Sequence, residues 1–154
     1  MEEKCLLTKK GCDKMKRVAF ICVHNSCRSQ MAEALAKRFG AGVIEAYSGG
    51  TELRSQINQD AVRIMKDLYQ IDMEESQRSK LLDELPEMDI TVKMGCNVSC
   101  PIALSDYEED WGLEDPSGKT DEEFIKTARI IEEKVKDLVK RIQDGKLLIR
   151  GDLV

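Results

Sequence analysis

The apolar run Val18-Ala-Phe-Ile-Cys-Val23 and the polar run His24-Asn-Ser-Cys-Arg-Ser29 that follows it carry the clearest structural signal in the chain. Six consecutive apolar residues ending at a polar stretch are typical of a fully buried strand of a parallel sheet. Beyond the polar stretch, apolar residues recur at helical spacing up to Phe39, and Gly40 then ends the pattern. The sequence here predicts a strand, a tight loop and a helix in direct succession.

The rest of the chain continues this alternation of strands and helices. Further strands are predicted at Val43–Tyr47, at Asp89–Met94 and around Tyr107–Leu113. The predicted helices follow the capping residue Asn58, cover Ser79–Leu85 before Pro86, and run from a capping box at Thr120 and Glu123 to Gly145. This order predicts an α/β fold, a four-stranded parallel sheet with helices on both faces.

Length and charge limit the class of protein. The 154 residues fit a single domain over residues 17–154, preceded by a loosely ordered extension over residues 1–16. The longest apolar run has six residues, too few for a membrane span or a signal peptide, so a cytoplasmic location is expected. A net charge of −5 argues against a nucleic-acid surface. Neither a membrane nor a nucleic acid is therefore an expected partner.

The chain has six cysteines, and their even number raises the possibility of a disulfide framework. They are Cys5, Cys12, Cys22, Cys27, Cys96 and Cys100. Such frameworks belong to short secreted chains, which lack the length to bury a core of their own. Catalytic or metal-binding thiols are the better interpretation for this chain.

The loop between Cys22 and Ser29 has the composition of an oxyanion site. Its backbone N–H groups and the following helix N-terminus can cradle a tetrahedral anion, and Arg28 can add a bidentate clamp. The same positive field favours the thiolate of Cys22, to which Ser29 can donate a hydrogen bond. Asn25 can adopt the left-handed backbone of a tight loop. The alternative is that Cys22 is a small buried apolar residue and Arg28 a surface charge.

Cys96 and Cys100 form a second candidate site, on a loop that Gly95 opens and Pro101 closes. Residues four apart in a helical turn have Cα atoms about 6 Å apart, which a disulfide accepts. The pair can therefore switch between dithiol and disulfide. Two alternatives stay open, an inert pair of thiols or a metal site completed by other cysteines, the lone histidine or carboxylates.

The sequence Cys22–Glu33 resembles the phosphate-binding loop of the low-molecular-weight tyrosine phosphatase superfamily, and Asn25–Glu33 resembles the thioredoxin-coupled arsenate reductases built on that fold. The resemblance covers about residues 17–143 and includes Tyr47–Thr51, the cysteine pair before Pro101, and Asp110–Lys119. It implies a three-layer, flavodoxin-like fold and an enzyme of arsenic detoxification. The oxyanion loop that it implies comprises Cys22, Val23, His24, Asn25, Ser26, Cys27, Arg28 and Ser29.

In the reductases that this sequence resembles, three cysteines act in turn, and they correspond here to Cys22, Cys96 and Cys100. Cys22 would attack arsenate, for which phosphate or sulfate can stand in. Cys96 would attack Cys22 and release arsenite, and Cys100 would then attack Cys96. An external thiol reductant, thioredoxin or another, would reduce the final disulfide. The last two cysteines are closer together than in the better-known members, which leaves the reductant open.

Asp115 precedes Pro116 near the end of the predicted fourth strand, where it can protonate a departing oxygen. The resemblance implies that it is the general acid, whereas an Asp-Pro turn is the structural alternative. The nearby acids are Glu108, Glu109, Asp110 and Glu114. They either form only a solvated face or favour a protonated Asp115 through their field.

A low-molecular-weight tyrosine phosphatase or another phosphomonoesterase is the rival function, and it would need Cys22, Arg28 and Asp115 only. Ser117 and Gly118 follow the Asp-Pro pair where a phosphatase needs an aromatic wall, which favours a small anion as substrate. A thiol-based redox or metal sensor without turnover is the third possibility.

No tightly bound cofactor is expected. Some relatives in the family bind a potassium ion beneath the loop, and Asn25, Glu33 and Ser48 stand at matching positions of this sequence. The resemblance assigns no required step to Cys27. His24 is expected to tune the local field or to point outward rather than to bind a metal.

Overall fold

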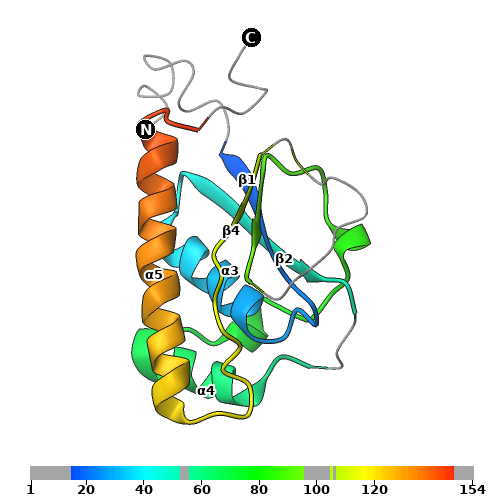
Figure 1. The fold of residues 1–154 in the computed structure, drawn as a ribbon, viewed down its shortest axis with the longest axis vertical. Coiled ribbons are helices and arrows are strands. Elements are labelled where there is room, and N and C mark those ends of the chain that lie inside the picture. The colour runs from blue at the N-terminus through cyan, green and yellow to red at the C-terminus, as the bar shows by residue number, and fades with distance from the viewer. Residues whose placement is uncertain (1–14, 53–55, 96–104, 106, 148–154) are drawn as a thin grey trace.

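A computed structural model describes residues 15–52, 56–95, 105 and 107–147. Four parallel strands form one sheet in the order β2-β1-β3-β4 (Figure 1), which confirms the predicted sheet. The strands are β1 (Lys16–Cys22), β2 (Ile44–Gly50), β3 (Ile90–Lys93) and β4 (Tyr107–Asp110). The predicted extension lies outside the described residues except at its end, where Lys16 already belongs to β1.

The carboxyl ends of the four strands meet at one edge of the sheet. Cys22 pairs with Gly50 of β2, Ile21 pairs with Lys93 of β3, and Lys93 pairs with Asp110 of β4. The chain leaves β1 toward β2 and returns to β3 on the other side of β1, so the loop after β1 lies where the strand order reverses. Open α/β sheets bind their ligands at this point.

The described residues form three α-helices beside the sheet, and two of these helices begin at a capping side chain. The three helices are α3 (Arg28–Phe39), α4 (Gln59–Tyr69) and α5 (Asp121–Gln143). The Asn58 side chain accepts hydrogen bonds from the backbone N–H groups of Asp60 and Ala61, at 2.9 and 3.1 Å. Thr120 caps α5 by accepting from Glu123 N at 3.4 Å, which is the threonine half of the predicted capping box. No helix in the described ranges has the length and apolarity needed to cross a bilayer.

The main core lies on one face of the sheet, where α5 runs alongside α3 and α4 (Figure 1). Val18 and Phe20 of β1 join it with buried side chains of all three helices, among them Met31, Leu35, Met65, Phe124, Ile131 and Leu138. Each such side chain stabilises the fold by about 1.5–3 kcal/mol through burial. The core therefore anchors α3, which begins at the oxyanion loop.

The opposite face carries a smaller core of Ala19, Ile21 and Met88, with Leu82 and Leu85 packed against it. Among the described residues, the helical element on this face is a short 3-10 turn, η2 (Leu82–Glu84). Another 3-10 turn, η1 (Met73–Glu75), follows α4. The prediction of a helix over Ser79–Leu85 is therefore wrong. Gly50 N donates to Lys80 O at 2.9 Å and Gly50 forms a bridge with Leu81, so Lys80 and Leu81 pair with the end of β2, and the 3-10 turn begins only at Leu82.

The fourth strand is shorter than predicted. The regular strand ends at Asp110, and Gly112, two residues later, adopts a left-handed backbone with φ of 59°. Trp111 N and Leu113 N still donate to Lys93 O and Met94 O, at 2.8 and 3.2 Å. Trp111 and Leu113 are nevertheless buried, and the Trp111 ring lies 5.5 Å from that of Phe20. The segment after β4 thereby stays against the core on its way to Asp115.

Candidate active site

The loop over residues 22–29, called the anion loop below, connects β1 to α3 as predicted. Asn25 has the expected left-handed backbone, with φ of 51°. The loop also packs tightly against the end of β2, because a Cβ atom on Gly50 would lie 2.6 Å from Val23 O and 2.8 Å from Asn25 N. Only glycine permits this close approach.

Cys22 and Ser29 are in direct contact inside the anion loop. Cys22 Sγ lies 2.8 Å from Ser29 Oγ, and both side chains are buried. The predicted contact between the two residues is thus present. Cys22 and Cys27 are both free thiols.

Arg28 is buried, with 6% of its surface exposed, so it is not a surface charge. Its Nη1 donates to Met94 O at 3.0 Å and to Leu113 O at 2.7 Å. Its Nη2 lies 3.8 Å from Asp115 Oδ2, and its buried Nε has no hydrogen-bond partner within the described residues. A buried unsatisfied donor costs about 1–3 kcal/mol, which a bound anion would relieve. The Nε–Nη2 edge therefore has the geometry of a bidentate anion clamp.

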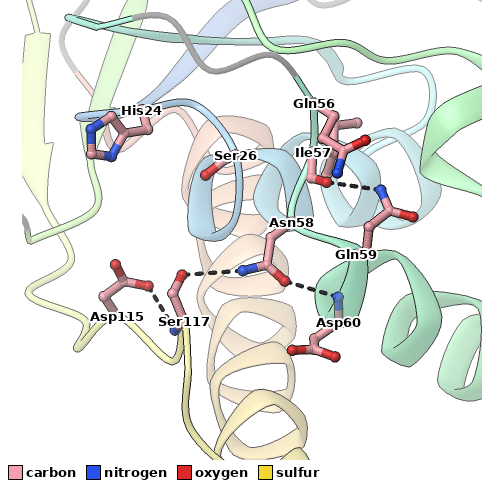
Figure 2. Close-up of a pocket in the computed structure, with 9 residues that line it drawn as sticks. All are labelled: His24, Ser26, Gln56, Ile57, Asn58, Gln59, Asp60, Asp115 and Ser117. Carbon is pink, nitrogen blue, oxygen red and sulfur yellow. Dashed lines mark hydrogen bonds between the residues drawn. The ribbon is translucent and has the colours of Figure 1, made fainter.

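A cavity of about 200 Å³ brings most of the predicted site residues together. Its lining consists of Cys22, Val23, His24, Ser26, Cys27, Arg28 and Asp115. A larger hollow of about 500 Å³ adjoins it and shares His24, Ser26 and Asp115 (Figure 2). The described residues that line this hollow include no phenylalanine, tyrosine or tryptophan, so they supply no wall for a phenyl ring.

Asp115 lies on the loop between β4 and α5, facing the hollow (Figure 2), with its side chain half exposed. Partial burial on its own raises the pKa of this carboxyl group. The backbone N–H and hydroxyl of Ser117, with Arg28 and His24, outweigh burial and hold the pKa below its ordinary value. Asp115 is therefore a carboxylate at neutral pH when the anion site is empty.

The expectation that neighbouring acids keep Asp115 protonated is wrong. Glu109 accepts two hydrogen bonds from Arg141 at 2.9 Å each, and it also pairs with the Trp111 indole. Glu108 and Glu114 form ion pairs with Lys93 and Lys119. These basic partners compensate the acidic charge locally, so its field at Asp115 is weak.

Cys27 and His24 line the same cavity without a catalytic arrangement of their own. Burial first, and then the charge of Asp115, raise the pKa of the Cys27 thiol to about 12. Cys27 is therefore a neutral thiol, unsuited to nucleophilic attack near pH 7. His24 Nε2 lies 3.1 Å from Glu52 Oε1 at the rim.

The three candidate potassium residues do not fit that ion. Ser48 Oγ donates to Glu33 Oε1 at 2.5 Å, while Lys37 Nζ and Lys80 Nζ lie 2.8 and 3.6 Å from the same carboxylate. Asn25 Oδ1 accepts from Lys80 N at 2.8 Å. Two ammonium groups already balance the single Glu33 charge, which leaves no electrostatic need for a further cation. Within the described residues, no group of three or more His, Cys, Asp or Glu side chains could hold a metal ion.

Cys96 and Cys100 lie outside the described residues. The described chain leading to them ends at Gly95, which has φ of 88° and a Cα so close to the segment after β4 that a Cβ would lie 2.4 Å from Leu113 N. Because Arg28 also donates to Met94 O, the chain up to Gly95 is held beside the anion loop.

Three polar residues of the site escape sequence reasoning. Ser117 supports Asp115, while Gln30 and Gln77 lie beneath the anion loop and hydrogen-bond to each other. Gln30 belongs to the quoted loop sequence, but Gln77 carries no local signal because its contacts are made across 47 residues of chain.

The comparisons with known proteins agree with this geometry. The model of the family "Low molecular weight phosphotyrosine protein phosphatase" matches residues 17–147. A glutaredoxin arsenate reductase of Synechocystis sp. is 38% identical over 133 residues, covering 83% of this chain and 99% of the relative. Arsenate reductase 2 of Staphylococcus epidermidis is 39% identical over 124 residues, covering 73% and 92%.

A solved structure described as an arsenate reductase in the phosphate binding state superposes with a TM-score of 0.75 at 37% identity. The match covers 83% of this chain and 99% of that one. The strand order, the anion loop and these matches share one explanation: the chain belongs to the low molecular weight phosphotyrosine protein phosphatase family, among its arsenate reductase members.

Proposed function

We propose that this protein reduces arsenate to arsenite, with Cys22 as the nucleophile. The observation that carries the proposal is the pairing, in one small cavity, of the Cys22 sulfur with an unpartnered buried donor, Arg28 Nε. A tetrahedral oxyanion placed there would satisfy the arginine and present its central atom to the sulfur. The names of the matched relatives support arsenate as that oxyanion.

In the first step the Cys22 thiolate attacks arsenic(V), forming a sulfur–arsenic bond. One arsenate oxygen takes up protons and leaves as water. The Ser29 hydroxyl stabilises the attacking sulfur, and Arg28 balances the charge of the anion. Asp115 is the general acid, and it can acquire its proton only once the anion raises its proton affinity.

In the second step Cys96 attacks the Cys22 sulfur and the sulfur–arsenic bond breaks. Its electron pair stays on arsenic, which leaves as arsenite, and two thiols become the Cys22–Cys96 disulfide. Cys100 then attacks Cys96, which frees Cys22 and leaves a Cys96–Cys100 disulfide. The connection of Gly95 to the anion loop supports a short path for this exchange.

The final disulfide requires an external dithiol protein, and the reducing cytoplasm supplies such proteins. Thioredoxin is the reductant that the resemblance implies, whereas the Synechocystis relative is named a glutaredoxin arsenate reductase. A turnover assay with each reductant separately would distinguish them, because only the physiological one should sustain multiple turnovers at micromolar concentration.

Hydrolysis of a phosphomonoester is the second candidate function, since the family model is that of a phosphatase. The polar hollow beside the anion loop disfavours an aryl phosphate, because none of its described lining residues is Phe, Tyr or Trp. Weak phosphatase activity is expected, as the same nucleophile and clamp would act on phosphate.

A single-turnover experiment tests the proposal. Fully reduced protein receives one equivalent of arsenate under nitrogen without reductant, and free thiols and arsenite are then counted. We expect two thiols lost per arsenite, no arsenite from Cys22→Ser or Cys96→Ser, and a trapped Cys22–Cys96 disulfide in Cys100→Ser. Cys12→Ser is the matched control. Aryl phosphate hydrolysis that survives Cys96→Ser, without any arsenite, would decide for the phosphatase.

A further inference from the structure

Four buried polar side chains form a continuous hydrogen-bonded row that ends at the Cys22 sulfur. Gln77 Nε2 donates to Gln30 Oε1 at 2.8 Å, and Gln30 Nε2 donates to Asn25 Oδ1 at 3.0 Å. Asn25 Nδ2 in turn donates to Ser29 Oγ at 2.9 Å, and Ser29 Oγ lies 2.8 Å from Cys22 Sγ. All four side chains are buried, and Gln77 alone lies far from the loop in sequence.

Backbone groups fix the direction of every amide in this row. The backbone N–H of Lys80 donates to Asn25 Oδ1 at 2.8 Å, so that atom must be the oxygen. Gln30 Nε2 faces the carbonyl oxygens of Asn25 and Arg78, both at 2.9 Å, so it must be the nitrogen. Gln77 Nε2 likewise faces Gln30 O at 3.0 Å. None of the three amides can therefore turn over without placing two like groups in contact.

This fixed direction presents an amide donor to the Ser29 hydroxyl, which contacts the Cys22 sulfur. Ser29 Oγ accepts from Asn25 with one lone pair, and it lies 2.8 Å from Cys22 Sγ. A Cys22 thiolate has no proton to give, so in that state the Ser29 hydroxyl can only donate to the sulfur, which stabilises the thiolate. When the donors of a row all point the same way, each amide polarises the next, and the last bond is strengthened by about 10–30% per link. The buried, low-dielectric setting of the row keeps water from interrupting it.

We propose that Gln77 is a positioning residue for the Cys22 thiolate, acting through Gln30 and Asn25 on the hydroxyl of Ser29. The proposal rests on the proposed function only in taking Cys22 as the nucleophile. Gln77 touches neither the sulfur nor the anion cavity, so any effect on Cys22 must travel along the row.

The test follows the alkylation of Cys22 by iodoacetamide from pH 5 to 9, with tandem mass spectrometry separating Cys22 from Cys27. Gln77→Met removes the donor at nearly constant size. We expect the midpoint of the Cys22 profile to rise by about 0.3–0.5 pH units, with alkylation below the midpoint about two- to threefold slower. The limiting rate at high pH should stay within about twofold, because the thiolate itself is unchanged. Gln143→Met, at the end of α5, is the control and should match the wild type.

A second mutation separates transmission through Ser29 from a general loosening of the loop. In a Ser29→Ala background, whose own midpoint rises by about one unit, Gln77→Met should cause no further shift. An equal shift with and without Ser29, or no shift in either, overturns the proposal. Since no arsenate is used, failure of arsenate reduction leaves this result intact.

Discussion

Arg28 Nη2 lies 3.8 Å from Asp115 Oδ2, so the residue expected to clamp the anion also contacts the carboxylate expected to act on it. The other terminal nitrogen of Arg28 is held by the carbonyls of Met94 and Leu113. An anion that enters the cavity must therefore share the Nη2 edge with Asp115. When the anion binds, Asp115 therefore shares the positive charge of Arg28 with a second negative group.

The pKa of the Asp115 carboxyl is expected to rise when an anion binds. In the free protein Ser117, Arg28 and His24 hold it low despite burial, whereas a bound dianion repels the carboxylate and draws on Arg28. Carbon-13 NMR titration with and without phosphate should show an upward shift of about one unit or more. The exposed carboxyl of Asp121 is the internal control. An unmoved Asp115 would show that it does not gain its proton from anion binding.

Replacing Arg28 with lysine should strongly lower kcat/KM for arsenate, although the positive charge is kept. Lysine can supply neither the two backbone bonds of Nη1 nor a planar pair of donors at the anion. We expect kcat/KM for arsenate to fall by about 100-fold or more. Arg63→Lys, an exposed arginine paired with Asp121, is the matched control and should change it by less than about twofold. If Arg28→Lys behaved like the control, a point charge would be sufficient at this site.

The sequence predicts the parts of the site that are local in the chain. The strand, the anion loop, the left-handed Asn25 and the Cys22–Ser29 contact lie within about a dozen residues, where spacing and residue type determine geometry. The helix expected over Ser79–Leu85 fails because Lys80 and Leu81 pair with Gly50, a partner that no local pattern reveals.

The same limit explains the wrong charge state of Asp115. Counting acids near it in sequence suggests a strong negative field, but Glu109 is neutralised by Arg141, which is 32 residues away on α5. Gln77 is another case, since its role depends on a contact 47 residues distant. Electrostatics and buried polar networks are set by tertiary pairing, which an isolated sequence does not show.

The Glu109–Arg141 pair should make the protein less stable in acid. Burial alone raises the pKa of Glu109, but bonds from Arg141, Trp111 and Tyr107 lower it to about 2. A pKa that is lower in the folded state stabilises the fold above the unfolded value, and this contribution is lost as pH falls toward 2. Glu109→Gln should lower the unfolding free energy at pH 7 by on the order of 1–3 kcal/mol.

Urea denaturation at several pH values measures the effect of Glu109→Gln. The difference from the wild type should shrink as pH falls from about 5 to 2, because protonation removes the same charge in both proteins. Glu133→Gln, an exposed glutamate on α5, should show a much smaller loss at every pH. A deficit of constant size down to pH 2 would assign the loss to packing or hydrogen-bond shape rather than to charge.

Gly95→Ala should destabilise the protein well beyond the usual penalty for a left-handed alanine. Gly95 and Gly118 both have positive φ, 88° and 79°, but only the Cβ on Gly95 would collide with backbone, 2.4 Å from Leu113 N. Gly118→Ala should therefore cost about 1–2 kcal/mol from φ alone, and Gly95→Ala at least ~2 kcal/mol more. Thermal and urea unfolding of the two variants measure the difference. Equal losses would mean that the segment beside Leu113 moves aside freely, and that the chain up to Gly95 is not held beside the anion loop.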